Sequence, residues 1–415
     1  MDFDKLLSKK YMPYLLLFAA ALMVYGLIYI FSEGFHPSAH NWYNNYSRQA
    51  HSWLQGRLDL PENRVYLEIA FFEGRNYISF PPFPSVVLLP LVTLFGDTTP
   101  DHWVALVFAL VSLVFAYKLG ELVLKDKKYA MFFSLFLILG TNYLHLSLWG
   151  AVWYLAQNMA FAFTLMAFYF ALTDSKRHAI LSLLALCAAM GCRPFNAIYL
   201  PLVLYLLYQR EGLSFFRFSR RLILYAVPAI VLGAFYMWLN YARFGSVFEF
   251  GHNYLPEFVR DYHGQFHPSR ILENFRMMFL ELDITYGIRN GFPFHGPGTS
   301  FAFWLASPMV ISYVVYLVIR YRSKPKGERD VTIWLIPLLV CLHLFAFLFH
   351  RTLGGRQYGS RYAADSLPAI YLGLLFILSK LRLTNRTYLM NSVPMMFGLL
   401  TNFYGTIIFF TFYFG

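Results

Sequence analysis

Acidic residues that could act as a general base stand in the polar stretch 41–84, which separates two hydrophobic segments. A general base must keep its charge, reach a hydroxyl group and occupy a partly desolvated place that raises its basicity. Glu68 and Asp59 each stand between two aliphatic residues and meet these conditions. The other two acidic residues of the stretch, Glu62 and Glu73, are expected to be more solvated. We therefore expect Glu68 or Asp59 to be the base; the competing interpretation is that each only caps a helix or forms an ion pair with a nearby arginine.

Arginines that could bind phosphate occur in the sequence RTLGGRQYGSRYAADSLP, residues 351–368. Its glycines allow a tight backbone, and Arg356 and Arg361 stand on either side of Tyr358. The planar guanidinium group can bind two phosphate oxygens at once. If this loop lies on the outer face of the membrane, its arginines contradict the positive-inside rule. A specific function, such as binding a lipid phosphate, would explain them. The alternative is that Arg361 snorkels to the membrane surface or pairs with Asp365.

Two further groups of residues each have two interpretations. Arg193 lies in an apolar stretch beside the helix-breaking Pro194, and it either joins a phosphate site in a cavity or anchors a helix on the inner side. A nearby loop has a set of residues that could bind a metal: His252, Glu257, Asp261, His263 and His267. No closed ligand set is evident among them, so we expect solvated loop residues and no metal site.

The composition is that of a membrane protein built from α-helices. The chain has 415 residues, of which 58% are hydrophobic and 13% charged. Apolar runs of about twenty residues, enough to span a hydrocarbon core of ~30 Å, recur along nearly all of it. We expect an all-α polytopic protein in which 1–415 is a single transmembrane domain with about eleven transmembrane helices. The net charge of +12 comes from basic loops between the spans, so nucleic acid is not an expected partner.

The distribution of basic residues predicts which side of the membrane each loop faces. It places the N-terminus in the cytoplasm and three polar segments on the outer face: 33–84, 243–300 and 351–364. The expected spans are 14–31, 102–123, 129–148, 152–173, 222–242, 301–319, 331–350, 365–380 and 388–413. The remaining spans come from 82–96 and 178–209, of which the second is expected to break at Cys192-Arg193-Pro194. Either 82–96 spans and 178–209 is one bent helix, or the reverse holds.

Two helices are expected outside the spans. Helical spacing predicts an amphipathic helix that lies on the bilayer surface, with its aromatic side chains at headgroup depth; its facing residues are Trp42, Tyr46, Gln49–Ala50 and Trp53–Leu54. Residues 271–281 are expected to form a short interfacial helix within the second large outer loop.

Several motifs occur in an order that is found in one family of membrane proteins. They are GRLDL, YLEIAFFEGRNYISFPPFP, CRPFN, NYARFGSVFEFGHNY and GGRQYGSRYAADSLPAIYL. With these motifs the chain resembles bacterial members of the GT-C superfamily of membrane glycosyltransferases. This broad group is related to protein O-mannosyltransferases and aminoarabinose transferases, and the resemblance covers most of the chain.

The resemblance implies an enzyme of the bacterial inner membrane. Such an enzyme transfers a sugar from a polyprenyl-phosphate donor to an acceptor on the extracytoplasmic face, with its catalytic acid in the first outer loop. With one of the candidate carboxylates as base, we expect a single displacement, which inverts the anomeric centre. The resemblance implies no cofactor besides this lipid-linked donor, and it leaves a divalent metal open. The acceptor can be a glycan, a lipid or a protein.

Residue by residue, the resemblance assigns roles to positions of this chain. Glu68 matches the first, acidic position of the family motif D-[LIV]-A-Y-Y-x-G-[KR]-x-Y-x-x-F-P-P-x-P. Arg361 matches the arginine of a later family motif, G-x-R-Y-x-x-x-x-x-P. Arg356 and Arg193 are the further candidates for the donor phosphate. The expected contacts to sugar or lipid are His40, Asn41, Tyr77, Tyr358 and His252.

At one position the chain departs from the family pattern. The acid of the family often follows the first span directly, whereas His40 and Asn41 stand there in this sequence. Two alternatives therefore stay open: a flippase or transporter of lipid-linked sugars, and a subunit of envelope assembly that has lost catalysis. A transporter would be expected to show an inverted repeat and charges at the bilayer midplane, and neither is clear in the sequence.

Overall fold

The computed structural model describes residues 7, 9–32, 34–64, 68–289, 292–323, 330–354 and 357–414, with the backbone alone for 283–289, 292–300 and 412–414. The chain divides into two compact units. Unit 1 comprises Met1–Ala39, Val107–Leu148 and Ser269–Gly415. Unit 2 comprises His40–Leu106 and Trp149–Pro268. Each unit is thus assembled from segments that are far apart in the sequence.

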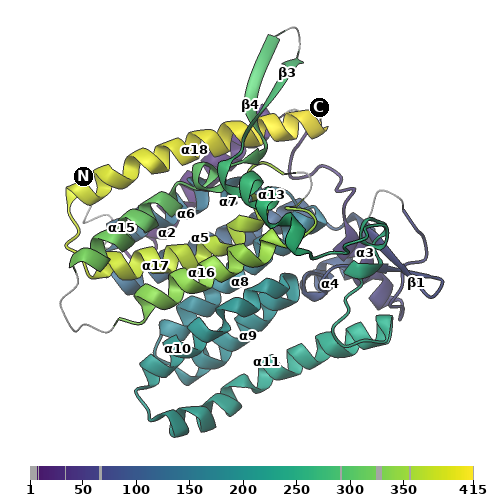
Figure 1. The fold of residues 1–415 in the computed structure, drawn as a ribbon, viewed down its shortest axis with the longest axis horizontal. Coiled ribbons are helices and arrows are strands. Elements are labelled where there is room, and N and C mark those ends of the chain that lie inside the picture. Colours follow the sequence, from purple (N-terminus) through teal and green to yellow (C-terminus); the bar gives the residue numbers. More distant parts are fainter. Residues whose placement is uncertain are drawn as a thin grey trace. The chain divides into compact units, whose positions relative to one another are not determined.

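Unit 1 is a set of helices with one β-hairpin (Figure 1). Its elements are α2 (Met12–Phe31), α5 (Asp101–Leu124, whose first turns belong to unit 2), α6 (Lys127–Leu139), α7 (Tyr143–Leu146), η4 (Pro268–Arg270), α13 (Ile271–Phe275), the π-helix η5 (Arg276–Leu280), β3 (Leu282–Arg289), β4 (Phe292–Phe301), α14 (Phe303–Ala306), α15 (Met309–Ser323), α16 (Thr332–Leu348), η6 (Arg361–Ser366), α17 (Leu367–Ser379) and α18 (Asn385–Phe414). The antiparallel β3–β4 hairpin projects from these helices.

Buried tyrosine hydroxyl groups join the helices of unit 1. Tyr371 on α17 donates to the carbonyl oxygen of Ala116 on α5 at 2.8 Å. Tyr143 on α7 donates to Ser112 on the same helix α5 at 2.7 Å. An unpaired hydroxyl in an apolar interior is costly, so these bonds fix how α7 and α17 pack on α5.

Unit 2 combines a small hairpin with long helices (Figure 1). Its elements are α3 (Asn45–Leu54), β1 (Ile69–Phe72), β2 (Arg75–Ile78), α4 (Phe83–Phe95), η1 (Gly96–Thr98), α8 (Val152–Leu172), α9 (Lys176–Cys192), η2 (Pro194–Tyr199), α10 (Leu200–Glu211), α11 (Phe215–Phe244), η3 (His252–Tyr254) and α12 (Pro256–Val259). Helix α9 packs against both α8 and α11. The contact with α11 is close at Gly191, where any added Cβ would overlap the Tyr236 ring.

The hairpin β1–β2 turns through two residues, Glu73 and Gly74. Both have positive φ, 46° and 76°. Two-residue hairpin turns with positive φ at both positions match the right-handed twist of the strands, and glycine adopts this conformation readily. The turn sets the antiparallel register, in which Phe72 pairs with Arg75.

The predicted break in 178–209 is confirmed. Helix α9 ends at Cys192, Arg193 adopts an extended conformation with φ −143° and ψ 100°, and η2 begins at Pro194. A residue before proline is disfavoured in the α region, and proline has no amide hydrogen to continue the helix. The break therefore places the Arg193 side chain at an irregular point between two helices.

The mostly helical fold agrees with the predicted class of polytopic helical protein. Six helices among the described residues are long and apolar enough to cross a membrane: Met12–Phe31, Asp101–Leu124, Val152–Leu172, Phe215–Phe244, Arg361–Ser379 and Asn385–Thr411. Two shorter apolar helices cover Phe83–Thr98 and Thr332–Leu348. The predicted number of about eleven spans stays a prediction.

Three details of the sequence prediction are wrong. The expected span 129–148 is two helices, because α6 ends at Leu139 before Gly140 and α7 begins only at Tyr143. The expected span 301–319 begins with the last residue of β4 and the short α14, and the long helix starts at Met309. The two hairpins were not expected in an all-α protein.

The predicted amphipathic helix of the first outer loop forms, as α3, but its polar side is buried. Asn45, Ser47, Gln49 and Ser52 are all buried. Ser85 on α4 donates to Gln49 Oε1 at 2.8 Å, which ties the two helices together. In the structure α3 thus directs polar side chains into unit 2, whereas the sequence pattern placed the helix on a bilayer surface.

Candidate active site

Glu68 directly precedes β1, and the hairpin positions it. Because Ile69 pairs with Ile78, Glu68 stands opposite Ser79, whose hydroxyl donates to the Glu68 carbonyl oxygen at 3.4 Å. The Glu68 side chain is half-buried. Its Oε2 accepts a hydrogen bond from the indole Nε1 of Trp153 at 2.9 Å. One oxygen of the carboxylate is therefore fixed against a tryptophan at the start of α8.

Aromatic rings surround this indole, and we call Tyr43, Trp149 and Trp153 the aromatic wall. The ring centroids of Tyr43 and Trp153 are 4.9 Å apart with a tilt of 48°. Trp149 is buried and contacts both rings, at 5.9 Å from Tyr43 and 6.4 Å from Trp153. A backbone hydrogen bond of 3.0 Å from Val152 to Tyr43 fixes the two segments. Tyr43 and Trp153 are half-buried, so each keeps some exposed ring surface.

A buried polar network holds the segments that carry the wall. Asp101, at the start of α5, is only 2% exposed. Its two oxygens accept hydrogen bonds from Ser47 Oγ at 2.7 Å and Asn41 Nδ2 at 2.9 Å. Asn41 Nδ2 also donates to the carbonyl oxygen of Gly150 at 2.9 Å. Asn41 thus ties Asp101 to the residue between Trp149 and the start of α8.

Gly150 lies against the first residues of α5 more closely than any other residue could. A Cβ built there would lie 2.5 Å from the Asp101 carbonyl carbon and 2.6 Å from the His102 amide nitrogen. The Gly150 amide donates to His102 Nδ1 at 2.9 Å. The position of the aromatic wall therefore depends on a glycine at this point.

A second polar group of unit 2 contains Arg193 and His252. His252 is half-buried, and its Nδ1 donates to the carbonyl oxygen of Ser79 at 3.3 Å. Burial lowers the pKa of His252 to about 4; the hydrogen bond to Ser79 opposes this shift, and the charge of Arg193 contributes to it. Arg193 also acts on the buried phenol of Tyr46, where its charge opposes the rise in pKa caused by burial. Ser79 therefore contacts both Glu68 and His252.

The lowered pKa of His252 predicts a loss of stability in acid. The unfolded chain takes up a proton near pH 6.5, whereas the folded chain takes it up only near pH 4. The folded state thus loses stability as the pH falls from about 6.5 towards 4, by about 1–2 kcal/mol at pH 5, and is unaffected above pH 7. We expect His252→Asn to remove part of the difference in unfolding temperature between pH 7 and pH 5. The exposed His263 provides the control, since His263→Asn should leave that difference unchanged; equal pH dependence in both variants would contradict the assignment.

Helix α3 brings further polar groups into unit 2. Asn45, Tyr46 and Gln49 are at most 1% exposed. Within the described part of the chain, neither polar side-chain atom of Asn45 has a hydrogen-bond partner, and the same holds for the Tyr46 hydroxyl and Gln49 Nε2. Buried polar groups are normally paired, so these atoms need water or a polar ligand.

Asp59, the second candidate base, lies in a salt bridge. Its Oδ2 is 2.9 Å from Nη2 of Arg57. The hydrogen bond from Arg57 lowers the pKa of Asp59, which makes this carboxylate a weaker base. The geometry thus favours the ion-pair interpretation for Asp59, and Glu68 stays the predicted base.

The three predicted sugar or lipid contacts nearest to these carboxylates in sequence have different surroundings. His40 is exposed and packs edge-on against Trp42 at 4.5 Å. Asn41 is buried in the network with Asp101. Tyr77 is buried in a small apolar cluster with Phe244. Of the three, His40 alone has a largely exposed side chain in the structure.

Arg361 lies in unit 1, at the start of η6, and is only 1% exposed. Its Nη2 donates to the carbonyl oxygen of Gly354 at 2.6 Å, and its backbone amide donates to Gln357 Oε1 at 2.9 Å. The guanidinium group also packs over the Tyr362 ring at 5.1 Å. Arg361 therefore organises the glycine-rich loop that precedes it, whatever else it binds.

The same loop contains two further predicted site residues, Tyr358 and Arg356. Tyr358 is buried, its hydroxyl donates to the carbonyl oxygen of Thr401 on α18 at 3.1 Å, and its ring stacks with Phe301. This favours a packing role over contact with a sugar. Arg356 lies outside the described residues.

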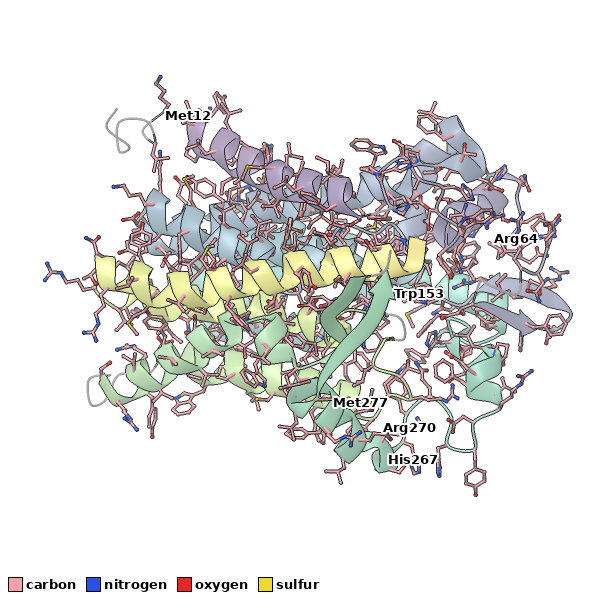
Figure 2. All side chains as sticks on the ribbon, turned by 90° about the horizontal axis from the view of Figure 1, so that it is seen from above. Met12, Arg64, Trp153, His267, Arg270 and Met277 are labelled. Carbon is pink, nitrogen blue, oxygen red and sulfur yellow. The ribbon has the colours of Figure 1, made fainter. Side chains whose placement is uncertain are left out.

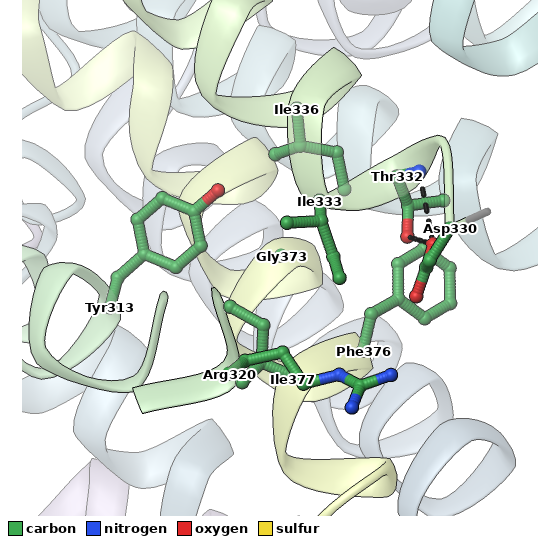
Figure 3. Close-up of a pocket in the computed structure, with 9 residues that line it drawn as sticks. All are labelled: Tyr313, Arg320, Asp330, Thr332, Ile333, Ile336, Gly373, Phe376 and Ile377. Carbon is green, nitrogen blue, oxygen red and sulfur yellow. Dashed lines mark hydrogen bonds between the residues drawn. The ribbon is translucent and has the colours of Figure 1, made fainter. Parts of the chain in front are cut away.

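A small pocket of unit 1 also contains polar side chains (Figure 3). It has a volume of about 10 Å³ and is lined by Arg320, Asp330 and Thr332 among other residues. Thr332 donates to Asp330 from both its amide and its hydroxyl. Such a volume holds a single water molecule, so a sugar does not fit there.

The structure thus gathers Glu68, Arg193 and His252 in unit 2 and places Arg361 and Tyr358 in unit 1. Among the described residues, no three His, Cys, Asp or Glu side chains are grouped so that they could hold a metal ion.

Three residues of the site escaped the sequence analysis. Trp153 and Asp101 contact residues that are 85 and 60 positions away in the sequence. Asp101 stands one residue before the expected span 102–123, Trp153 stands at the start of the expected span 152–173, and Tyr43 was not singled out in the first polar segment. The two segments TPDHW and LWGAVW each place polar or aromatic residues beside an apolar run. This is the local sequence signal that could have pointed to Asp101 and Trp153.

Comparison with known proteins supports the fold. No protein-family model matches the chain, and no curated protein matches its sequence. Solved structures do match, and they show that the chain shares the fold of ArnT and of an archaeal oligosaccharyltransferase, in agreement with the GT-C-like fold that the sequence motifs predict.

The particular structures are two of ArnT and one of an archaeal enzyme. ArnT from Cupriavidus metallidurans bound to undecaprenyl phosphate superposes with a TM-score of 0.56 and 14% identity, over 93% of this chain and 63% of that chain. Its apo state gives 0.50 and 15%, over 91% and 61%. The oligosaccharyltransferase from Archaeoglobus fulgidus in the apo form gives 0.51 and 13%, over 97% and 56%. The chain therefore spans less than two thirds of the length of each of these proteins.

Proposed function

We propose that the protein is a multi-pass membrane glycosyltransferase that transfers a sugar from a polyprenyl-phosphate donor to an acceptor hydroxyl on the extracytoplasmic face. The observation that carries this proposal is the half-buried Glu68 carboxylate, held on the indole of Trp153 in the same unit as Arg193 and His252. The fold shared with ArnT supports the donor class, since that protein was solved with undecaprenyl phosphate. The basic loops of the sequence support a cytoplasmic N-terminus, and the resemblance to bacterial membrane glycosyltransferases supports the inner membrane.

In the proposed reaction Glu68 is the general base. Its carboxylate takes the proton of the acceptor hydroxyl while the hydroxyl oxygen bonds to the anomeric carbon of the donor sugar. The bond from that carbon to the phosphate oxygen breaks, and its electron pair leaves with the polyprenyl phosphate. A single displacement of this kind inverts the anomeric configuration. The indole hydrogen bond from Trp153 keeps the carboxylate oriented during the step.

An arginine is needed for the negative charge of the leaving phosphate. In unit 2 we assign this role to Arg193, which stands at the break before Pro194 and whose charge contributes to the lowered pKa of His252. Arg361 of unit 1 is the other candidate, on the strength of its match to the late motif. Both arginines are candidates because a guanidinium group binds phosphate, and each is tested by its own substitution.

The proposed function is tested with the purified full chain in lipid vesicles. A panel of radiolabelled polyprenyl-phosphate sugars is offered together with an extract of envelope glycans, lipids and proteins as acceptors. We expect one donor to lose its label to an acceptor at a rate that rises with enzyme concentration. Stable binding of a donor without loss of label would overturn the assignment as a transferase and favour the transporter or assembly-subunit alternative.

Replacement of each arginine by glutamine measures its contribution to phosphate binding. We expect Arg193→Gln to lower the rate at limiting donor by about 10- to 100-fold and Arg193→Lys to restore part of it, because lysine keeps the charge but loses the fork. The same pair of changes at Arg361 is compared by donor titration and by thermal unfolding. A fall in unfolding temperature at unchanged donor affinity would assign Arg361 to the structure of its loop alone.

A further inference from the structure

The exposed ring surface of the aromatic wall lies beside the proposed base. Trp153 donates its indole hydrogen to Glu68, so the carboxylate lies at the edge of the ring and both faces of the indole stay clear of it. Tyr43 contacts the same ring at 4.9 Å. Both side chains are half-buried, whereas Trp149 behind them is fully buried.

The wall is rigid, which matters for its use as a binding surface. Trp149 packs against both other rings, and the amide of Val152 holds the Tyr43 backbone. Asn41 fixes Gly150, the neighbour of Trp149, through its bond to the carbonyl oxygen. A preformed surface loses little conformational entropy when a ligand binds.

An aromatic face next to a carboxylate has the chemistry that recognises a pyranose ring. The π face of an indole or phenol carries partial negative charge. One face of a pyranose presents several C–H bonds, which are apolar and slightly positive and pack on such a π face. The hydroxyl groups at the rim of the sugar ring then point sideways, where a carboxylate accepts their hydrogen bonds. The serine or threonine side chain of a protein acceptor has no ring that could stack on the indole in this way.

We propose that the acceptor is a sugar, and that its pyranose ring stacks on Trp153 and Tyr43 while one of its hydroxyl groups donates to Glu68. This inference rests on the proposed function, because it names the acceptor class of that reaction. It assigns Trp153 and Tyr43 as residues that determine acceptor specificity. The acceptor is accordingly a glycan or the sugar headgroup of a glycolipid.

The test separates acceptor binding from transfer. Quenching of tryptophan fluorescence by methyl pyranosides (glucoside, galactoside and N-acetylglucosaminide) is measured on the full chain in lipid vesicles without donor. We expect saturable quenching by at least one of them and its loss in Trp153→Leu. Trp42→Leu is the matched control, since Trp42 is 58% exposed in the same polar segment and packs on His40. That variant should bind the pyranoside as the wild type does.

Transfer is then measured with the donor found above and two acceptors, a pyranosyl oligosaccharide and a serine- and threonine-containing peptide. We expect transfer to the oligosaccharide, with the acceptor KM raised at least 10-fold in Trp153→Leu and the donor KM unchanged. Trp153→Phe keeps a ring but lacks the indole hydrogen, so it should keep most of the acceptor affinity and lose rate instead. This second variant also covers the case in which Trp153→Leu does not fold.

The outcomes distinguish the two proposals. Transfer to the peptide alone, with KM values that do not depend on Trp153, would overturn the sugar acceptor and leave the transferase standing. Pyranoside binding through Trp153 without turnover of any donor would overturn the transferase and retain the sugar site. The sugar site would be overturned if no pyranoside bound to the protein and if Trp153→Leu left the acceptor KM unchanged.

Discussion

Glu68→Gln is expected to lower the rate of sugar transfer by about 10²- to 10³-fold, because a positioned general base contributes a factor of that order. Glutamine has nearly the same shape as glutamate, and its carbonyl oxygen still accepts the hydrogen bond that Trp153 donates to Glu68 at 2.9 Å. The substitution therefore removes the proton acceptor and leaves the hairpin and the wall in place. The measurement is the initial rate of label transfer from the lipid donor at saturating donor and acceptor.

Asp59→Asn is the matched control for this experiment. Asp59 pairs with Arg57 at 2.9 Å, and its lowered pKa makes it a poor base. Its replacement should change the transfer rate by less than about threefold, in line with the small contribution of exposed ion pairs. A rate that falls in Asp59→Asn and persists in Glu68→Gln would reverse the assignment of the two carboxylates.

Gly150→Ala is expected to destabilise unit 2 by about 3 kcal/mol, at the upper end of the cost of overpacking. The added methyl group would lie 2.5 Å from the backbone of Asp101. Backbone atoms cannot move away as the end of a flexible side chain can. Relief of the overlap has to separate α5 from the segment that carries Trp149 and Trp153. We expect a lower unfolding temperature and, in the molecules that stay folded, a loss of transfer.

Gly233→Ala provides the comparison within the same unit. A Cβ at Gly233 on α11 meets only the Cys187 sulfur, at an ordinary contact distance of 4.0 Å. Alanine is the better helix former, so this variant should be as stable as the wild type or slightly more stable. Unfolding temperatures that match between Gly150→Ala and Gly233→Ala would show that the contact between Gly150 and Asp101 is not as tight as described.

Local sequence signals predicted those features of the site that depend on neighbouring residues. The sequence Cys192-Arg193-Pro194 predicted a broken helix, because the constraint imposed by proline is local. The aliphatic neighbours of Glu68 in the sequence predicted a partly desolvated carboxylate, and its side chain is half-buried in the structure. The pairing of Glu68 with Trp153 depends on how two distant segments pack, and neither segment shows it alone.

The orientation of α3 shows a different limit. Its pattern of polar and apolar residues identified a helix with two sides, and that helix exists at Asn45–Leu54. The pattern does not say what each side faces when the surroundings include both lipid and protein. In the structure the polar residues Asn45 and Gln49 are buried, and Ser85 of α4 donates to one of them. Packing against α4 therefore decided which way the helix turned.

The two-residue turn of the β1–β2 hairpin limits how this chain can vary in evolution. Side chains alternate between the two sides of a strand, so one inserted residue in a strand reverses every side chain beyond it. An insertion between Glu68 and the turn at Glu73–Gly74 would direct the carboxylate away from Trp153, although no active-site residue had changed. We therefore expect related chains to keep the spacing from this carboxylate to the turn without gaps, while the exposed residues 61–63 tolerate insertions and deletions.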